Sequence, residues 1–221
     1  LISGMVGSVA QPIFAQMTDD SERQVRAFRK MLRFTAFISF PCMLGLSLVA
    51  PELITIAITD KWIGSARILQ LLAIWGAFFP IANLYSNLLI SRGKSDIYLR
   101  NTVTLGILQL IVIYLLRSHG IFFMVSVYVG INICWLFVWH YFVQKEIGLP
   151  LSSALKDVLP YLGIAGGVMC FTYYVTAIIT TNLYGSLALK IVIAAVTFVL
   201  IMWLSGSVTF KESIGYIFRK R

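Results

Sequence analysis

The sequence predicts an all-α, polytopic helical membrane protein, and the first support for this fold class is the length of its apolar stretches. Six of them are each long enough, at about 1.5 Å per residue, to cross roughly 30 Å of hydrocarbon as a helix. No acidic or basic side chain falls near the middle of any stretch, and most charges lie in the connections between them. The six stretches cover residues 34–58, 66–90, 97–117, 119–142, 158–180 and 184–205.

The composition supports the same class and argues against a soluble nucleic-acid-binding protein. Hydrophobic residues make up 59% of the chain and the mean hydropathy is +0.86, which leaves too little polar surface to cover a soluble globule. The net charge of +9 comes from Lys and Arg residues that flank the apolar stretches, where such residues set the orientation of a membrane protein. We therefore expect a lipid bilayer as the surroundings and no nucleic acid as a partner.

The expected elements follow one another in a simple order along the chain. Residues 1–17 have the pattern of the end of a truncated transmembrane helix, since they are largely apolar and lack the basic start of a signal peptide. We therefore expect the chain to be the C-terminal part of a longer protein. Residues 18–33 are expected as a basic cytoplasmic loop, and residues 34–142 as four transmembrane helices. The remaining elements are a cytoplasmic loop (143–157), two further transmembrane helices (158–205) and a basic cytoplasmic tail (206–221).

The distribution of Lys and Arg predicts the orientation, because alternate loops must lie on the same side of the membrane. One side carries 14 of the 18 basic residues, and the other carries Lys61, Arg67, Arg117 and Lys190. This asymmetry predicts that the basic side, including the C-terminus, is cytoplasmic. The basic segments 18–33 and 144–157 either attract anionic lipid headgroups along the membrane surface or serve only to set this topology.

Prolines predict kinks in several helices. Pro41 and Pro80 lie well inside their stretches, where a missing backbone donor and a steric clash bend or end a helix. Such kinks are common in transporters and also in membrane proteins generally. After Pro51 we expect the first helix to end near Ala50 and a short hook to continue to the outer surface, where Trp62 is placed as an interfacial aromatic residue.

Four neutral polar residues at membrane depth are the candidate lining of a cavity. Asn83, Ser86 and Asn87 fall at i, i+3 and i+4, on one face of their helix, and Gln109 lies in the next stretch. Such residues either form hydrogen bonds to a neighbouring helix, which is the commoner case, or line a hydrated cavity. Amides and hydroxyls in a cavity would suit a cargo with many hydroxyl groups better than a small cation.

No catalytic, cofactor-binding or metal site is predicted. His140 falls near the cytoplasmic end of its stretch between Trp139 and Tyr141, which favours an interfacial residue over a general base or a ligand. The three cysteines lie inside apolar stretches without paired spacing, which favours small apolar fillers over a disulfide or a zinc site: Cys42, Cys134 and Cys170.

Residues 11–96 resemble one known family in three consecutive segments. These are a proline-containing helix end with an acidic-then-basic segment, a span with mid-helix proline followed by Ala-Pro-Glu and Lys-Trp, and a span that ends in a basic turn. They read QPIFAQMTDDSERQVRAFRKMLR, FISFPCMLGLSLVAPELITIAITDKW and ARILQLLAIWGAFFPIANLYSNLLISRGKSD. The chain thereby resembles the polysaccharide (O-antigen or exopolysaccharide) flippases, of the lipopolysaccharide-biosynthesis type, in the multidrug/oligosaccharidyl-lipid/polysaccharide exporter superfamily.

The resemblance implies the C-terminal part of a two-bundle exporter fold. In such proteins two bundles of six helices face each other across a central cavity, and some members add two C-terminal helices. Residues 1–17 would then be the end of helix eight, and the six stretches helices nine to fourteen. The missing N-terminal helix bundle of the same protein would be a partner. Cationic cavity residues of the family meet an anionic pyrophosphate-lipid cargo, but no residue of this chain matches them.

The function that the resemblance implies is transport without covalent chemistry. The cargo would be a polyprenyl-pyrophosphate-linked oligosaccharide, an O-antigen or exopolysaccharide repeat unit, moved across the bacterial inner membrane by alternating access. One alternative is a polytopic enzyme of polysaccharide assembly, such as a polymerase, ligase or acyltransferase, which needs acid or base groups at a membrane face. Another is an ion-coupled small-molecule exporter, which needs an intramembrane carboxylate, whereas Glu52, Asp60 and Asp157 fall at stretch ends.

Overall fold

The computed structural model describes residue 14, residues 20–179 and residues 182–205. This part of the chain forms six long α-helices, two 3₁₀ turns and no strand. The helices are α2 (Ser21–Ala57), α3 (Ile63–Ser91), α4 (Ser95–Leu115), α5 (Ile121–Ile147), α6 (Leu151–Ile178) and α7 (Leu183–Leu204), and the turns are η1 (Asp60–Trp62) and η2 (Arg117–His119). All six helices are long and apolar enough to cross a membrane, which confirms the predicted fold class.

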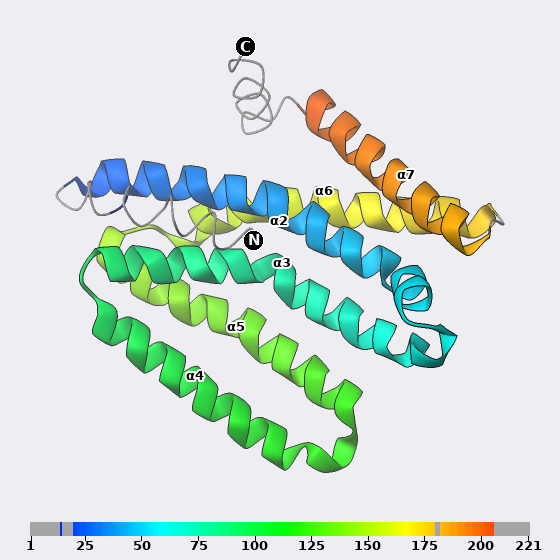
Figure 1. Cartoon of the computed structure of the whole chain (residues 1–221). Coiled ribbons are helices and arrows are strands. Elements are labelled where there is room, and N and C mark those ends of the chain that lie inside the picture. The colour runs from blue at the N-terminus through cyan, green and yellow to red at the C-terminus, as the bar shows by residue number, and fades with distance from the viewer. Residues whose placement is uncertain (1–13, 15–19, 180–181, 206–221) are drawn as a thin grey trace.

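Helices α2 and α3 form the centre of the arrangement. They pack against each other more extensively than any other pair, α6 and α7 lie against α2, and α5 lies against α3. Helix α4 is outermost and packs mainly on α5 (Figure 1). The order across the molecule therefore runs from the α6–α7 pair through α2 and α3 to the α5–α4 pair.

The core lies where α2 faces α3, and it extends toward α5 and α6. Phe28, Leu32 and Phe40 of α2 are fully buried there, together with Leu84 and Leu88 of α3. Their spacing of four or eight residues places each set on one helix face. The outward faces carry large apolar side chains as well, as expected of helices whose surroundings are lipid.

The two predicted cytoplasmic loops are shorter in the structure than the sequence suggests. Residues 21–33 are the first turns of α2, and the side chain of Asp20 caps them by accepting from the backbone N–H of Arg23 at 2.9 Å. No Gly or Pro interrupts the chain between this cap and the apolar part, so the helix continues through the charged turns. In segment 143–157, α5 continues to Ile147 and ends at Gly148, whose φ of +70° suits glycine.

Pro51 does not end the first long helix, and the predicted boundary near Ala50 is wrong. Helix α2 continues through Pro41 and Pro51 to Ala57, and its 37 residues correspond to about 55 Å. Pro80 and Pro160 also lie inside helices, α3 and α6 respectively. A helix can continue past a proline when another group binds the carbonyl that the proline leaves without a donor.

Candidate functional site

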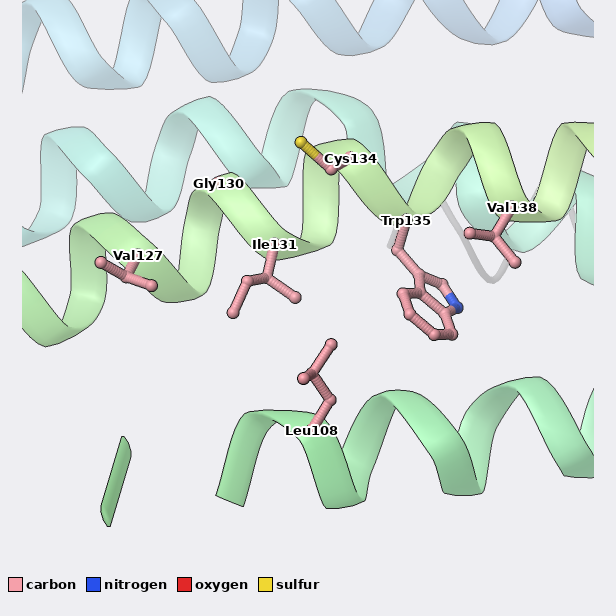
Figure 2. A pocket seen from close by; sticks show the side chains of 7 residues that line it. All are labelled: Leu108, Val127, Gly130, Ile131, Cys134, Trp135 and Val138. Atoms are coloured by element: carbon pink, nitrogen blue, oxygen red, sulfur yellow. The ribbon is translucent and has the colours of Figure 1, made fainter. Parts of the chain in front are cut away.

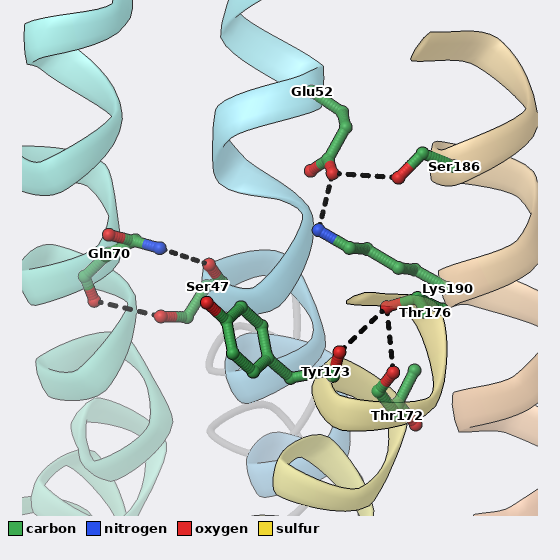
Figure 3. A network of polar contacts seen from close by, with 8 residues as sticks. All are labelled: Ser47, Glu52, Gln70, Thr172, Tyr173, Thr176, Ser186 and Lys190. Carbon is green, nitrogen blue, oxygen red and sulfur yellow. Dashed lines mark hydrogen bonds and ion pairs between the residues drawn. The ribbon is translucent and has the colours of Figure 1, made fainter. Parts of the chain in front are cut away.

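The carbonyl freed by Pro51 is bound by a neighbouring helix. Pro51 lacks the N–H that would bond to the carbonyl of Ser47, four residues earlier. Instead, Nε2 of Gln70 on α3 donates to this carbonyl at 3.1 Å, and the Ser47 hydroxyl donates to the carbonyl of Gln70 at 3.4 Å (Figure 3). This reciprocal pair explains why α2 continues through the proline and why α3 stays beside it.

A second hydroxyl-to-carbonyl contact joins the same two helices near Pro80. The buried Ser39 hydroxyl of α2 donates to the carbonyl of Ala77 on α3 at 2.8 Å. Ala77 lies in the helical turn before Pro80, where the proline ring disturbs the regular ladder. Each of the two kinked helices therefore supplies polar side chains to the backbone of the other.

A buried ion pair joins α2 to α7. The ammonium of Lys190 contacts Oε1 of Glu52, and the hydroxyl of Ser186 donates to the same oxygen at 3.1 Å (Figure 3). Both charged residues are only 8% exposed, and Oε2 of Glu52 is a buried atom with no hydrogen-bond partner in the described part of the chain. Removing either charge would leave the other uncompensated in a poorly solvated place, so the pair fixes α7 against α2.

At the opposite end of α2, a second ion-pair cluster joins α2 to α6. Arg29 contacts both carboxylate oxygens of Asp157, with Nε–Oδ2 at 2.6 Å and Nη2–Oδ1 at 3.1 Å, and Arg33 adds a contact of 3.5 Å. Asp157 is 4% exposed although it lies in one of the predicted loops. The bidentate geometry is the strong form of this interaction. The two segments that were expected as separate surface loops therefore meet here.

The end of α3 is connected to α2 and α5 in the same region. Arg92 donates to the side-chain oxygen of Gln24 at 2.5 Å and lies 3.6 Å from Glu146 of α5. Lys94, in the turn after α3, lies 3.7 Å from the same carboxylate. These basic residues were predicted only from their role in orientation, and the structure shows that they also join helices.

His140 is buried against α3, and its predicted position at the membrane interface stays a prediction. It is 3% exposed, and its Nδ1 lies 3.3 Å from the hydroxyl of Tyr85 on α3. The face of α5 that carries His140 turns inward toward α3, which the flanking aromatic residues Trp139 and Tyr141 did not reveal. Nε2 of His140 has no hydrogen-bond partner among the described residues.

Two of the four predicted cavity residues form hydrogen bonds, one within its helix and one between helices. The Ser86 hydroxyl donates within α3 to the carbonyl of Ala82 at 2.9 Å, and Asn83 and Asn87 are half-buried on the same helix. Gln109 of α4 donates to Asn132 of α5 at 3.1 Å. Their role in lining a cavity stays a prediction.

The described residues offer no group suited to metal binding. No three His, Cys, Asp or Glu residues in this part of the chain lie close enough to hold an ion. The three cysteines are free thiols at exposed positions of α2, α5 and α6, so they do not fill the interior: Cys42, Cys134 and Cys170. Several polar groups of the described part connect helices, and the six long apolar helices define a multi-spanning helical membrane protein.

Comparison with known proteins finds similarity to proteins whose descriptions name polysaccharide biosynthesis. Residues 1–67 match a family described as polysaccharide biosynthesis protein. The chain is 26% identical over 178 residues to an uncharacterized membrane protein in the cps region of Klebsiella pneumoniae, a match that covers 80% of this chain and 33% of the relative. It is also 26% identical over 173 residues to the teichuronic acid biosynthesis protein TuaB of Bacillus subtilis, with 77% and 36% covered.

A third relative is the lipopolysaccharide biosynthesis protein WzxC of Escherichia coli. It is 30% identical over 96 residues, which cover 43% of this chain and 20% of WzxC. No solved structure matches the chain. The chain spans about a third of the length of the first two relatives. These matches confirm that it is related to membrane proteins of polysaccharide biosynthesis, as the resemblance over residues 11–96 predicts.

Proposed function

We propose that the chain supplies six helices of a flippase that moves a polyprenyl-pyrophosphate-linked oligosaccharide across the bacterial inner membrane by alternating access. The observation that carries this proposal is the similarity of more than three quarters of the chain to membrane proteins of polysaccharide biosynthesis. Two relatives are named for teichuronic acid and lipopolysaccharide, so an O-antigen or exopolysaccharide repeat unit is the cargo class that fits.

The proline-containing helices support a protein that changes conformation. Alternating access requires helices to bend or rock without exposing unpaired backbone groups to hydrocarbon. Gln70 meets this requirement at Pro51, and Ser39 binds a backbone carbonyl beside Pro80. Together, α2, α3, α6 and α7 are suited to move as one unit, since polar contacts fasten them at both ends.

The buried acidic residues support transport over the enzymatic and ion-coupled alternatives. A general acid or base needs a carboxyl that is open to a substrate, and ion coupling usually uses an intramembrane carboxylate that is not already paired with a basic side chain of the protein. Asp157 is engaged by Arg29 and Arg33, and Glu52 by Lys190 and Ser186. Both carboxylates therefore hold helices together, and we assign neither of them a catalytic role.

The orientation follows from the charge asymmetry. The end that carries Arg29, Arg33 and Arg92 belongs to the side with most of the basic residues, and we assign it and the C-terminus to the cytoplasm. The remaining partners in this proposal are the lipid-linked oligosaccharide and an N-terminal helix bundle of the same protein, which would complete the central cavity.

The test is a flipping assay on the full-length protein that contains this chain. The protein is reconstituted in liposomes with a fluorescent polyprenyl-pyrophosphate oligosaccharide in one leaflet, and a membrane-impermeant quencher reports its arrival in the other. The expected result is loss of the protected fluorescence with protein present and its persistence in protein-free liposomes. Labelled lipid that stays in its starting leaflet in both samples contradicts the proposal.

A further inference from the structure

Helices α4 and α5 border a wide, open apolar groove that the proposed function does not use. Its volume is about 440 Å³, within the usual range for small-molecule pockets of roughly 300–1,000 Å³. Figure 2 shows Leu108 of α4 opposite the lining side chains of α5. The lining residues are apolar, apart from the Cys134 thiol and the indole N–H of Trp135, whose buried Nε1 has no hydrogen-bond partner among the described residues: Leu108, Val127, Gly130, Ile131, Cys134, Trp135 and Val138.

Contacts outside the groove set its width. Gln109, next to Leu108, donates to Asn132 of α5, and Asn132 is itself held by the carbonyl of Tyr128 at 2.7 Å. The rings of Tyr98 and Trp139, 6.1 Å apart, join the same two helices nearer the start of α4. Because these contacts do not depend on anything in the groove, the two helices hold it open before an occupant arrives.

Gly130 forms a notch in the wall of the groove. A Cβ atom added at this position would meet no other heavy atom within 4 Å. The neighbouring wall residues Val127, Ile131 and Cys134 lie three residues before, one after and four after it, on the same side of α5. A methyl group at Gly130 therefore fits without a clash, and a longer side chain would take up space in the groove.

The groove is continuous with the apolar outer surface of the two helices. Large side chains beside it are mostly exposed, among them Ile107 at 54% and Ile111 at 52% on α4, and Phe137 at 55% on α5. Both helices have the length and composition of membrane spans, so this surface faces hydrocarbon. A polar ligand or a water cluster would need several hydrogen-bonding partners, whereas the lining holds only the Cys134 thiol and the buried N–H of Trp135.

We propose that the groove between α4 and α5 binds an acyl chain of a membrane phospholipid. An acyl chain is the apolar, flexible ligand that the surroundings of a spanning helix supply in excess, and it needs no polar partner. In the groove, an acyl chain contacts Gly130 and Ile131 on one side and Leu108 on the other. Lipid on the open helix faces lacks this second side and therefore makes fewer contacts.

The test is photocrosslinking in vesicles of phosphatidylethanolamine and phosphatidylglycerol that contain a phospholipid with a diazirine in the middle of one acyl chain. The full-length protein is irradiated, and crosslinked peptides are identified by mass spectrometry. We expect labelling of Leu108 and of the groove residues within 127–138, most of which are half-buried, to exceed several-fold that of the more exposed α7 residues Ile191 and Val196. Equal labelling on α7 overturns the proposal.

Filling the notch provides the matched variant. Gly130→Leu should lower groove labelling by at least about fourfold, since loss of contact with one methylene weakens apolar binding by about that factor. Gly163→Leu on α6, where an added Cβ also meets nothing within 4 Å, should leave groove labelling unchanged. If Gly130→Leu elutes as an aggregate, the smaller Gly130→Ala change carries the test and should give a partial decrease.

A different occupant of the groove would give a different crosslinking result, and each such result would overturn the proposal. If a further helix of the protein or a second copy covers the groove, residues 127–138 should show no lipid crosslinks. If an isoprenoid chain is the occupant, a small amount of added polyprenyl phosphate should displace the phospholipid label. If groove labelling is unchanged by polyprenyl phosphate and decreases in the Gly130→Leu variant, the result supports a phospholipid acyl chain as the occupant.

Discussion

Helices α3 and α4 are similarly apolar, but they occupy very different positions in the structure. The most apolar 18-residue stretches of the two spans have mean hydropathies of 1.6 and 1.4. However, 39% of the α3 stretch is buried inside the protein, and only 6% of the α4 stretch. Helix α3 lies between α2 and α5, whereas α4 lies at the outside (Figure 1). Apolar composition therefore predicts that a helix spans the membrane and says nothing about how many neighbours it has.

The difference extends to the polar contacts of each region. The α2–α3–α6–α7 region is joined by buried ion pairs and by side chains that bind backbone carbonyls. The α4–α5 pair is joined near its middle by the Gln109–Asn132 hydrogen bond and borders an apolar groove. Lipid competes with protein for apolar surface, so polar contacts and close packing decide which helices stay together.

The largest expected effect comes from breaking the buried ion pair of the first region. Lys190→Met leaves the charge of Glu52 without its partner and should destabilise the full-length protein by about 3–5 kcal/mol. The measurement is its apparent melting temperature in detergent. Adding Glu52→Gln to this variant should restore much of the loss, and a double variant as unstable as the single one would contradict the assigned role.

Next comes a comparison of matched leucines in the two helices. Leu88→Ala in α3, where the side chain is fully buried, should cost about 2 kcal/mol, mainly through the cavity that it leaves. Leu110→Ala in α4, where the side chain is 70% exposed, should change stability by less than about 0.5 kcal/mol, because lipid fills the space. Chemical denaturation of both variants measures the difference, and equal costs would show that α4 is covered by protein.

The arginine cluster should show a smaller effect. Asp157→Asn removes the charge that Arg29 and Arg33 share and should destabilise by about 1.5 kcal/mol, since these side chains stay partly exposed to solvent. Asp96→Asn, which breaks an exposed pair with Arg100, is the matched control and should cost less than about 0.5 kcal/mol. A full urea titration gives the free energy of unfolding of each variant. Equal losses in the two variants would show that Asp157 is solvated.

The smallest expected effect compares two glutamines. Gln70→Leu removes the donor to the Ser47 carbonyl beside Pro51 and should cost about 1 kcal/mol. Gln109→Leu removes a side-chain hydrogen bond between α4 and α5 and should cost about 0.6 kcal/mol, the average for such bonds in membranes. Thermal unfolding in the same detergent compares the stability of the two variants. A larger loss of stability in Gln109→Leu would contradict our assignment of the stronger polar contacts to the α2–α3–α6–α7 region.

The sequence predicts the helices better than their ends. The six spans were correct because length and hydropathy are local properties of the chain. The boundary at Pro51 was wrong because Gln70, nineteen residues further on, binds the freed carbonyl. The loop at 18–33 was expected from its charge, although nothing in its sequence disfavours a helix.

For the candidate site residues, spacing along the sequence indicated which polar side chains share a helix face, but it did not indicate their hydrogen-bond partners. Ser86 is bonded within its own helix and Gln109 to α5, and no pattern in the sequence indicates which neighbour each one has. The pairing of Glu52 with Lys190 was missed because each residue was counted as a charge near a loop. One signal was available, since Lys190 lies within an apolar stretch where a single cation requires a partner.

The sequence by itself determined that the described part of this chain is helical, that six of its helices are long and apolar enough to cross a membrane, and that the chain is related to polysaccharide biosynthesis proteins. Each of these properties follows from residues within one segment. The tertiary structure decided that Asp157 meets Arg29, 128 residues away, and that Glu52 meets Lys190, 138 residues away. Such contacts depend on how helices cross, and crossing is set by side-chain packing between segments that are distant in the chain.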